Sequence, residues 1–107
     1  MTSIPEALSI GGKLANYAET TATYYIKGTI IEITSPDLYG NMTIEDEDGN
    51  TLYIYGTWDK TGANRYGYMS NPPQVGDKVV LVGTIKNYNG TIEMMNGRFY
   101  DIIWLPE

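Results

Sequence analysis

From Tyr24 onward, short segments that alternate between apolar and polar residues are separated by tight-turn sequences. Such alternation is typical of strands with one buried face, because successive side chains of a strand point to opposite sides. The expected hairpin turns are Asp48-Gly49-Asn50 and Tyr88-Asn89-Gly90, since glycine and asparagine tolerate positive φ angles. We therefore predict an all-β protein in which residues 1–107 form a single domain.

Glycines inside two of the predicted strands indicate a barrel. Gly28 and Gly83 interrupt the first and fourth strands, and a glycine within a strand marks a bend or a close approach of two backbones. Ile30-Ile31 followed by Ile33 breaks the alternation and predicts a bulge. These features favour a five-stranded OB-type Greek-key barrel over about residues 21–105. The expected strands are 24–34, 42–47, 51–56, 78–88 and 91–96, and Gly97 is expected to bend the chain into a tail, 98–105, into which the sheet could extend.

A short helix is predicted before the barrel. Ser3 and Glu6 have the spacing of a capping box, and Pro5 is tolerated in a first helical turn. Apolar residues continue at helical spacing, so we place the helix at about residues 4–15. Gly11-Gly12 either ends this helix or weakens its middle.

The connection between the third and fourth strands, residues 57–74, is unusually long for a compact domain. Many OB-type barrels carry a helix there, but the glycines, asparagines and two prolines of this segment leave room for only one turn within 63–69. We therefore expect the apolar stripe of the N-terminal helix to plug the open end of the barrel instead.

Histidine and cysteine are both absent from the sequence. Their absence excludes disulfides and thiolate chemistry, and it removes the commonest general base and metal ligand. The acidic run 45–48 falls in a predicted hairpin and lacks the ligand spacing of an EF-hand loop. No phosphate-binding Gly-Lys-Ser/Thr motif and no Ser-Lys catalytic motif is present. We expect a protein that is not an enzyme and that uses no cofactor and no metal.

The sequence also carries no membrane or export signal. No stretch is long and apolar enough to span a bilayer, and the first residues lack the pattern of a signal peptide. As written, the protein is expected in the cytoplasm and away from membranes, and its oligomeric state is left open.

Several motifs along the predicted strands form a recognisable set. They are Tyr25-Ile26-Lys27-Gly28-Thr29-Ile30, residues 39–46, Leu52-Tyr53-Ile54-Tyr55-Gly56, Val75-Gly76-Asp77-Lys78-Val79 and Tyr88-Asn89-Gly90. From about residue 3 to about residue 98, the chain resembles bacterial OB-fold domains of the nucleic-acid-binding type. The resemblance implies the barrel fold, an opening helix and nucleic-acid binding. Because such domains also occur in secreted and phage-associated proteins, it implies an origin of that kind as an alternative.

The outer face of the first three strands is the expected binding surface, because OB-type barrels bind oligonucleotides and oligosaccharides over their second and third strands and the flanking loops. The alternation places on this face Tyr25, Lys27, Thr43, Tyr53 and Tyr55. At its edges we expect Tyr39 and Trp58, and in the loop between the fourth and fifth strands Tyr88. The expected phosphate contacts are Lys27, Lys60, Arg65, Lys86 and Arg98.

Single-stranded DNA or RNA is the predicted partner, because aromatic rings stack on bases for about 1–3 kcal/mol each. The net charge of -6 opposes this prediction, and Glu45 on the same face would repel phosphates. The alternative is a protein- or glycan-interaction module of a larger bacterial or phage assembly, since tyrosines also stack on sugar rings. A third interpretation is that the tyrosines pack under the 57–74 connection or against a partner.

Overall fold

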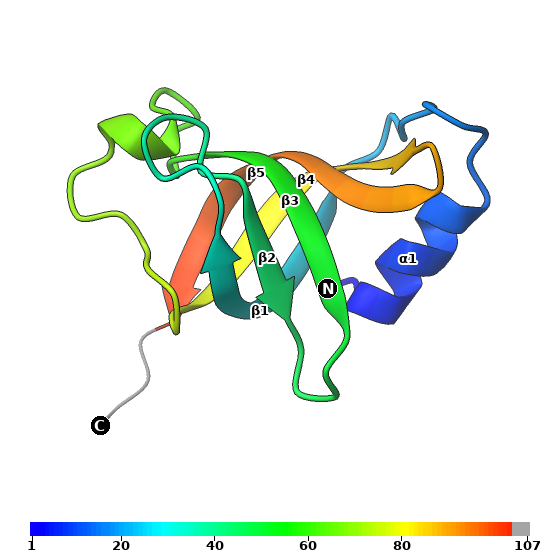
Figure 1. Cartoon of the computed structure of the whole chain (residues 1–107), viewed down its shortest axis with the longest axis horizontal. Coiled ribbons are helices and arrows are strands. Elements are labelled where there is room, and N and C mark those ends of the chain that lie inside the picture. Colours follow the sequence, from blue (N-terminus) through cyan, green and yellow to red (C-terminus); the bar gives the residue numbers. More distant parts are fainter. Residues whose placement is uncertain (104–107) are drawn as a thin grey trace.

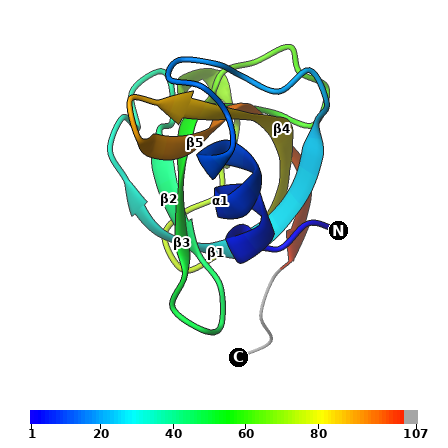
Figure 2. The same ribbon diagram turned by 90° about the vertical axis from the view of Figure 1, so that its right-hand side faces the viewer.

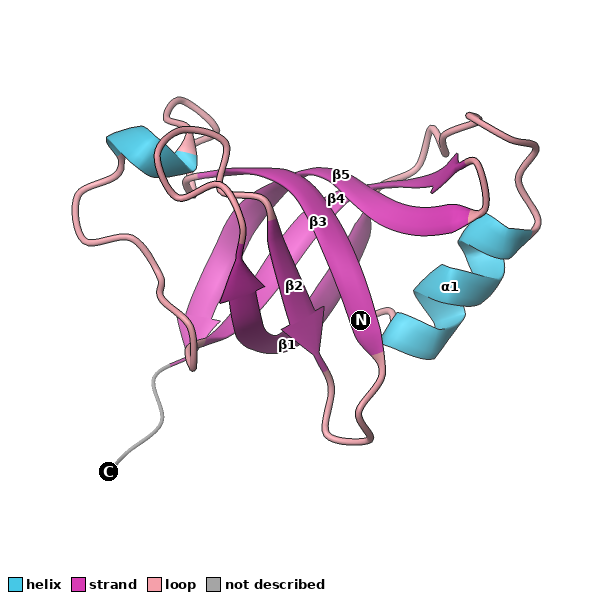
Figure 3. Cartoon of the chain, in the orientation of Figure 1, coloured by secondary structure: helices cyan, strands magenta, loops and turns pink. Residues whose placement is uncertain are grey.

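The computed structural model describes residues 1–103 of the chain. Five strands close into a barrel in the order β1-β2-β3-β5-β4, and one short helix precedes them (Figures 1 and 3). The elements are α1 (Ile4–Gly12), β1 (Tyr24–Ile33), β2 (Met42–Glu45), β3 (Thr51–Trp58), the 3-10 turn η1 (Tyr66–Tyr68), β4 (Lys78–Tyr88) and β5 (Thr91–Ile103). β3 and β5 run parallel, and the other neighbours are antiparallel. The predicted five-stranded OB-type barrel with a short N-terminal helix is confirmed.

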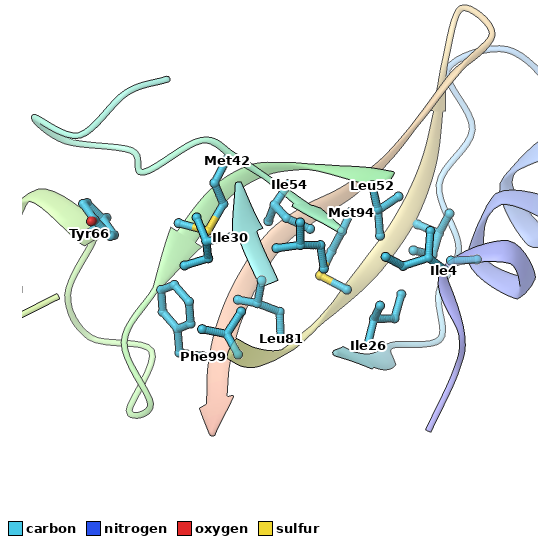
Figure 4. Close-up of a cluster of buried hydrophobic side chains, with 14 residues drawn as sticks. Ile4, Ile26, Ile30, Met42, Leu52, Ile54, Tyr66, Leu81, Met94 and Phe99 are labelled. Atoms are coloured by element: carbon cyan, nitrogen blue, oxygen red, sulfur yellow. The ribbon is translucent and has the colours of Figure 1, made fainter. Parts of the chain in front are cut away.

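The core of the barrel is filled by the inward-facing apolar residues of all five strands (Figure 4). Both ends of this core are closed by side chains from outside the barrel: Ile4 of α1 lies at one end and Tyr66 of η1 at the other (Figure 4). The inward strand residues are Ile26, Ile30, Met42, Ile44, Leu52, Ile54, Val79, Leu81, Ile85, Met94 and Phe99.

α1 lies across one end of the barrel, as Figure 2 shows. Its capping box is formed, with the Glu6 N–H donating to Ser3 Oγ at 3.1 Å and the Ser3 N–H donating to Glu6 Oε1 at 3.2 Å. The helix ends at Gly12, three residues before the predicted end. Gly11 is buried so closely against β5 that a Cβ there would lie 2.3 Å from Ile92 Cγ2. Beyond it, the chain turns to run beside β4 instead of continuing the helix.

β1 bends so that its two halves pair with different strands. Residues 24–29 pair with β4, whereas residues 29–33 pair with β2. The register shifts between Ile30 and Glu32, which confirms the predicted bulge. Gly83 is a point of close approach, as predicted, because a Cβ there would lie 2.7 Å from the Met95 carbonyl oxygen.

Four predicted strand ends were wrong. β1 ends at Ile33, one residue before the predicted end. β2 ends at Glu45 because the chain turns at Asp46. The Asp46 carboxylate accepts hydrogen bonds from the backbone N–H groups of Asp48 and Asn50 and so stabilises the turn. β3 continues to Trp58. β5 does not end at residue 96; it runs as one strand to residue 103, while residues 104 and 105 of the predicted tail lie outside the described residues. Gly97 lies within β5 and does not bend the chain away from the sheet. Glycine fits this position because a Cβ there would lie 2.9 Å from Ile54 Cγ2 in the core.

The connection after β3 folds back on the barrel as two small units. Residues 58–65 form a tight hairpin closed by the Asp59 N–H, which donates to the Asn64 carbonyl at 2.9 Å. η1 follows, which agrees with the single helical turn predicted within 63–69. The Tyr66 hydroxyl donates to the Pro73 carbonyl, and burial raises the pKa of this phenol. No helix within residues 1–103 combines the length and apolar character that crossing a bilayer requires.

Candidate functional site

Most of the tyrosines stand on the surface of the barrel. Of the ten, Tyr66 is buried and Tyr24 and Tyr53 are half-buried. The other seven are 41% to 72% exposed: Tyr17, Tyr25, Tyr39, Tyr55, Tyr68, Tyr88 and Tyr100. Core packing therefore does not account for the tyrosine content of the chain.

Three tyrosines gather around one hollow of about 370 Å³ on the outer face of β3, β5 and β4. Strand register brings them together, because Tyr53 on β3 lies opposite Glu93 on β5, which in turn lies opposite Lys86 on β4. We call this depression the tyrosine hollow; it is lined by Tyr53, Tyr55, Lys86, Tyr88, Glu93 and Met95.

Glu93 is the unusual member of this hollow. The residue is only 8% exposed, and burial raises the pKa of its carboxyl, while the positive charge of Lys86 acts in the opposite direction. No hydrogen bond to the carboxylate is made within residues 1–103. No fully buried side-chain oxygen in the described part of the chain lacks a hydrogen-bond partner, so the Glu93 oxygens remain open to the hollow.

A second hollow, of about 460 Å³, adjoins the first at Met95, which lines both. One row of strand pairs crosses it, from Tyr25 through Val82 and Arg98 to Trp58. We call it the tryptophan hollow; among its lining residues are Glu19, Tyr25, Trp58, Val82, Met95 and Arg98. Because the hollows share a side chain, they form one continuous surface over β3, β5 and β4.

At one end of this surface, the guanidinium of Arg65 stacks on the rings of Trp58 and Tyr39. The Cζ atom of Arg65 lies 4.1 Å from the ring centroid of Trp58 and 4.8 Å from that of Tyr39. Gly56 leaves the space for this arrangement, because a Cβ there would lie 2.9 Å from Arg65 Nη1. The φ angle of Gly56, +82°, also favours glycine. The two hollows together with this stack are the aromatic strip.

Two loops hold the stack in place. The Thr57 N–H donates to the Tyr39 carbonyl at 2.8 Å, which fixes the loop between β1 and β2 against β3. On the other side, the Asp59 carboxylate accepts hydrogen bonds from Thr61, Ala63 and Asn64. These bonds, chiefly those from Asn64 and Thr61, lower the pKa of Asp59 to about 2. The hairpin that presents Arg65 is therefore tied together by one ionised carboxylate.

The structure brings together most of the predicted site residues, but on a different set of strands. Four of them meet in the tyrosine hollow, and three form the stack. Tyr25 lies across the tryptophan hollow, where its ring meets that of Tyr100 edge-on at 5.0 Å between centroids. The two hollows lie mainly over β3, β5 and β4, whereas the predicted face spanned β1, β2 and β3.

Lys27 and Thr43 line neither hollow and take no part in the stack. Lys27 is paired with Val80 of β4 and lines a depression that also holds Lys78 and the acidic run 45–48. Thr43 faces Tyr53 from β2, on the side of β3 away from Glu93. Lys27 lies away from β2 because β1 bends, so that only residues 29–33 pair with β2.

Sequence reasoning missed Glu19 and Glu93 of the strip and Tyr17 beside it. Tyr17 packs edge-on against Tyr88 with 5.5 Å between ring centroids, and Glu19 accepts the hydroxyl of Thr84 at 2.6 Å. Both belong to the segment after α1, which has no alternating pattern to reveal that it runs beside β4. Glu93 could have been found, since it stands between Ile92 and Met94 in a strand that an OB-type barrel places next to β3.

Charges of both signs lie along the strip. Glu19, Glu93 and Asp101 line the hollows or their edge together with cationic side chains. Lys60, Arg65, Lys86 and Arg98 line the strip or its edges; Arg98 Nη1 also donates to the Lys60 carbonyl at 3.0 Å. The acidic run 45–48 lies instead in the β2–β3 hairpin, at the opposite end of β3 from Trp58 (Figure 1). There the Asp46 carboxylate accepts the side-chain N–H of Asn50 at 2.9 Å, which chiefly lowers its pKa.

Within residues 1–103, no three acidic, histidine or cysteine side chains converge as metal ligands would. Comparison of the chain with protein-family models and with curated proteins finds no match.

Proposed function

We propose that the protein is a non-catalytic module that binds single-stranded nucleic acid along the aromatic strip. The observation that carries this proposal is the continuity of the strip, along which aromatic rings and cationic side chains lie side by side. Single-stranded nucleic acids are bound by this combination, because rings stack on bases while cations follow the phosphates. The resemblance to bacterial and phage OB-fold domains of the nucleic-acid-binding type supports the same proposal.

The dimensions of the strip suit several nucleotides. Tyr53 and Trp58 are five residues apart on one strand, which corresponds to about 17 Å. The stack of Tyr39 and Arg65 extends the strip beyond Trp58. OB-type barrels bind roughly 4–16 nucleotides, so the strip has room for the lower end of this range.

The net charge of -6 is a weaker objection once the charges are located. Phosphates respond to the local field, which a Debye length of about 10 Å confines to the neighbourhood of the strip. Four of the seven cationic side chains lie there beside the carboxylates of Glu19, Glu93 and Asp101, so the local charge is near balance, and the acidic run 45–48 is part of a separate hairpin.

Fluorescence anisotropy with labelled oligothymidylate and oligouridylate of about twelve nucleotides tests the proposal. Three to four phosphate contacts predict a slope of about −2 to −3 in log K against log salt. Affinity should then fall about 20- to 50-fold between about 50 mM and about 200 mM salt. Absence of binding at tens of micromolar protein in low salt would contradict the proposal.

Paired variants show whether the strip is the surface involved. Tyr53→Ala combined with Tyr55→Ala should abolish binding and leave the barrel folded. Tyr68→Ala is the matched control, because this tyrosine is 72% exposed on η1 and does not line either hollow. Loss of folding in the double variant would instead mean that the two rings serve the core.

The alternative of a protein- or glycan-interaction module uses the same rings and predicts a different response to salt. Stacking of sugars on tyrosines involves no phosphate, so binding of an oligosaccharide should not change over the same range of salt. An oligosaccharide that binds where oligonucleotides do not would favour this alternative.

A further inference from the structure

The floor of the tyrosine hollow holds an acceptor that the protein itself leaves unused. Glu93 is 8% exposed, lines the hollow, and receives no hydrogen bond from the described residues. Lys86, the neighbour of Glu93 on β4, makes no hydrogen bond to this carboxylate, and its ammonium lies 5.8 Å from the ring centroid of Tyr88. A carboxylate in this position is ready to accept N–H groups from a molecule that enters the hollow.

The flat rings around Glu93 restrict what that molecule can be. Tyr53, Tyr55 and Tyr88 offer stacking surfaces, so a planar group that carries N–H donors on its edge fits best. Nucleobases are such groups, and proteins read their Watson–Crick edges when the bases are unstacked.

The two oxygens of a carboxylate distinguish among the bases. Guanine presents two adjacent donors, N1–H and N2–H, on its Watson–Crick edge. Thymine and uracil present one N–H between two carbonyl oxygens. Adenine and cytosine place a ring-nitrogen acceptor beside their amino group, and this lone pair would face a carboxylate oxygen. Only guanine can therefore make two parallel hydrogen bonds to an ionised carboxylate.

We propose that the tyrosine hollow is a guanine-selective pocket within the strip, in which Glu93 accepts N1–H and N2–H of a base stacked on the surrounding tyrosines. This inference rests on the proposed binding of single-stranded nucleic acid. It gives a role to a negative charge that otherwise only weakens the attraction between the strip and phosphates. It also names the first base-reading residue of a surface whose other contacts, rings and cations, are indifferent to sequence.

The test compares oligonucleotides that differ at one position, with the full chain as the binding protein. An oligothymidylate of about twelve nucleotides is measured against the same strand carrying one central guanosine, inosine, adenosine or cytidine. The guanosine strand should bind about tenfold more tightly than the adenosine, cytidine and plain oligothymidylate strands, since a bidentate pair discriminates by about this factor or more. Inosine lacks the N2 amino group and should be intermediate.

Glu93→Gln replaces one acceptor oxygen by a donor, so it should remove the guanine preference. The same variant should bind plain oligothymidylate at least as well as the unchanged protein, because a negative charge has left the strip. Glu47→Gln is the matched control: it removes an exposed charge from the acidic hairpin, outside the strip, and it should keep the preference.

The outcomes separate the two proposals. If every strand binds with the expected salt dependence but guanosine gives less than about a threefold advantage, the guanine pocket is wrong and nucleic-acid binding stands. A preference that survives in Glu93→Gln also overturns the assignment. If no strand binds at all, the proposed function fails and the guanine pocket fails with it; a partner that offers an arginine guanidinium to Glu93 would then become the better hypothesis.

Discussion

Replacement of Ile4 by alanine should destabilise the barrel strongly, because this side chain closes one end of the core. Ile4 is 1% exposed and belongs to the same cluster as Ile26 and Leu52. Truncation of a fully buried isoleucine to alanine costs about 2–5 kcal/mol, since hydrophobic burial is lost and a cavity remains. With a loss near 3 kcal/mol, the midpoint of thermal unfolding should fall by roughly 12–24 °C.

The matched control is Ile31→Ala, on the bulge of β1. Ile31 is 42% exposed, so the same chemical change removes little buried surface there. We expect the free energy of unfolding to fall by no more than about 1 kcal/mol, which is the size of the difference in strand propensity between isoleucine and alanine. Urea unfolding followed by circular dichroism measures the stability of both variants. Their free energies of unfolding can be compared if they depend on urea concentration with similar slopes.

A shorter chain extends this experiment. Deletion of residues 1–15 removes Ile4, Ala7 and Gly11 together and should lower the midpoint further than Ile4→Ala alone. Equal effects of Ile4→Ala and Ile31→Ala, or an unchanged midpoint after the deletion, would refute the view that α1 plugs the barrel.

Three further changes test single contacts. Gly56→Ala should weaken oligonucleotide binding and stability together, because its Cβ meets Arg65 Nη1 and its φ angle is +82°; retained affinity in a titration would argue against the stack. Glu93→Gln should raise stability at neutral pH but not at about pH 4 in urea unfolding, because the raised pKa means that the folded protein loses stability as Glu93 ionises. An equal gain in the free energy of unfolding at both pH values would contradict this expectation. Asp59→Asn should make stability less sensitive to acid, because the lowered pKa confers stability above 3.8 that is lost as pH falls toward about 2. Parallel acid-unfolding curves for both proteins would refute that expectation.

Local patterns predicted much of the fold. The alternation of Leu52 and Ile54 with Tyr53 and Tyr55 placed the side chains of β3 correctly, because a strand has a fixed period of two. The capping box at Ser3 and Glu6 located the start of α1 for a similar reason, since its geometry is local.

The parts that the sequence could not predict depend on contacts between distant segments. After α1 the chain runs beside β4, where the Tyr17 N–H donates to the Asn87 carbonyl, and no helical pattern reveals this contact. Likewise, the face shared by Tyr53 and Lys86 follows from the pairing of β5 with both β3 and β4. The prediction grouped tyrosines by neighbouring strands in the chain, whereas the barrel groups them by neighbouring strands in space.

Amide chemical shifts recorded during titration with oligothymidylate test the role of the aromatic strip most directly. Binding along the strip predicts that the largest shift changes fall at residues 53–58 of β3, 84–88 of β4 and 93–98 of β5, with Arg65 among them. The acidic hairpin, 45–50, and Lys27 should change little. Changes centred on β1 and β2, or no changes at saturating oligonucleotide, would contradict nucleic-acid binding at this surface.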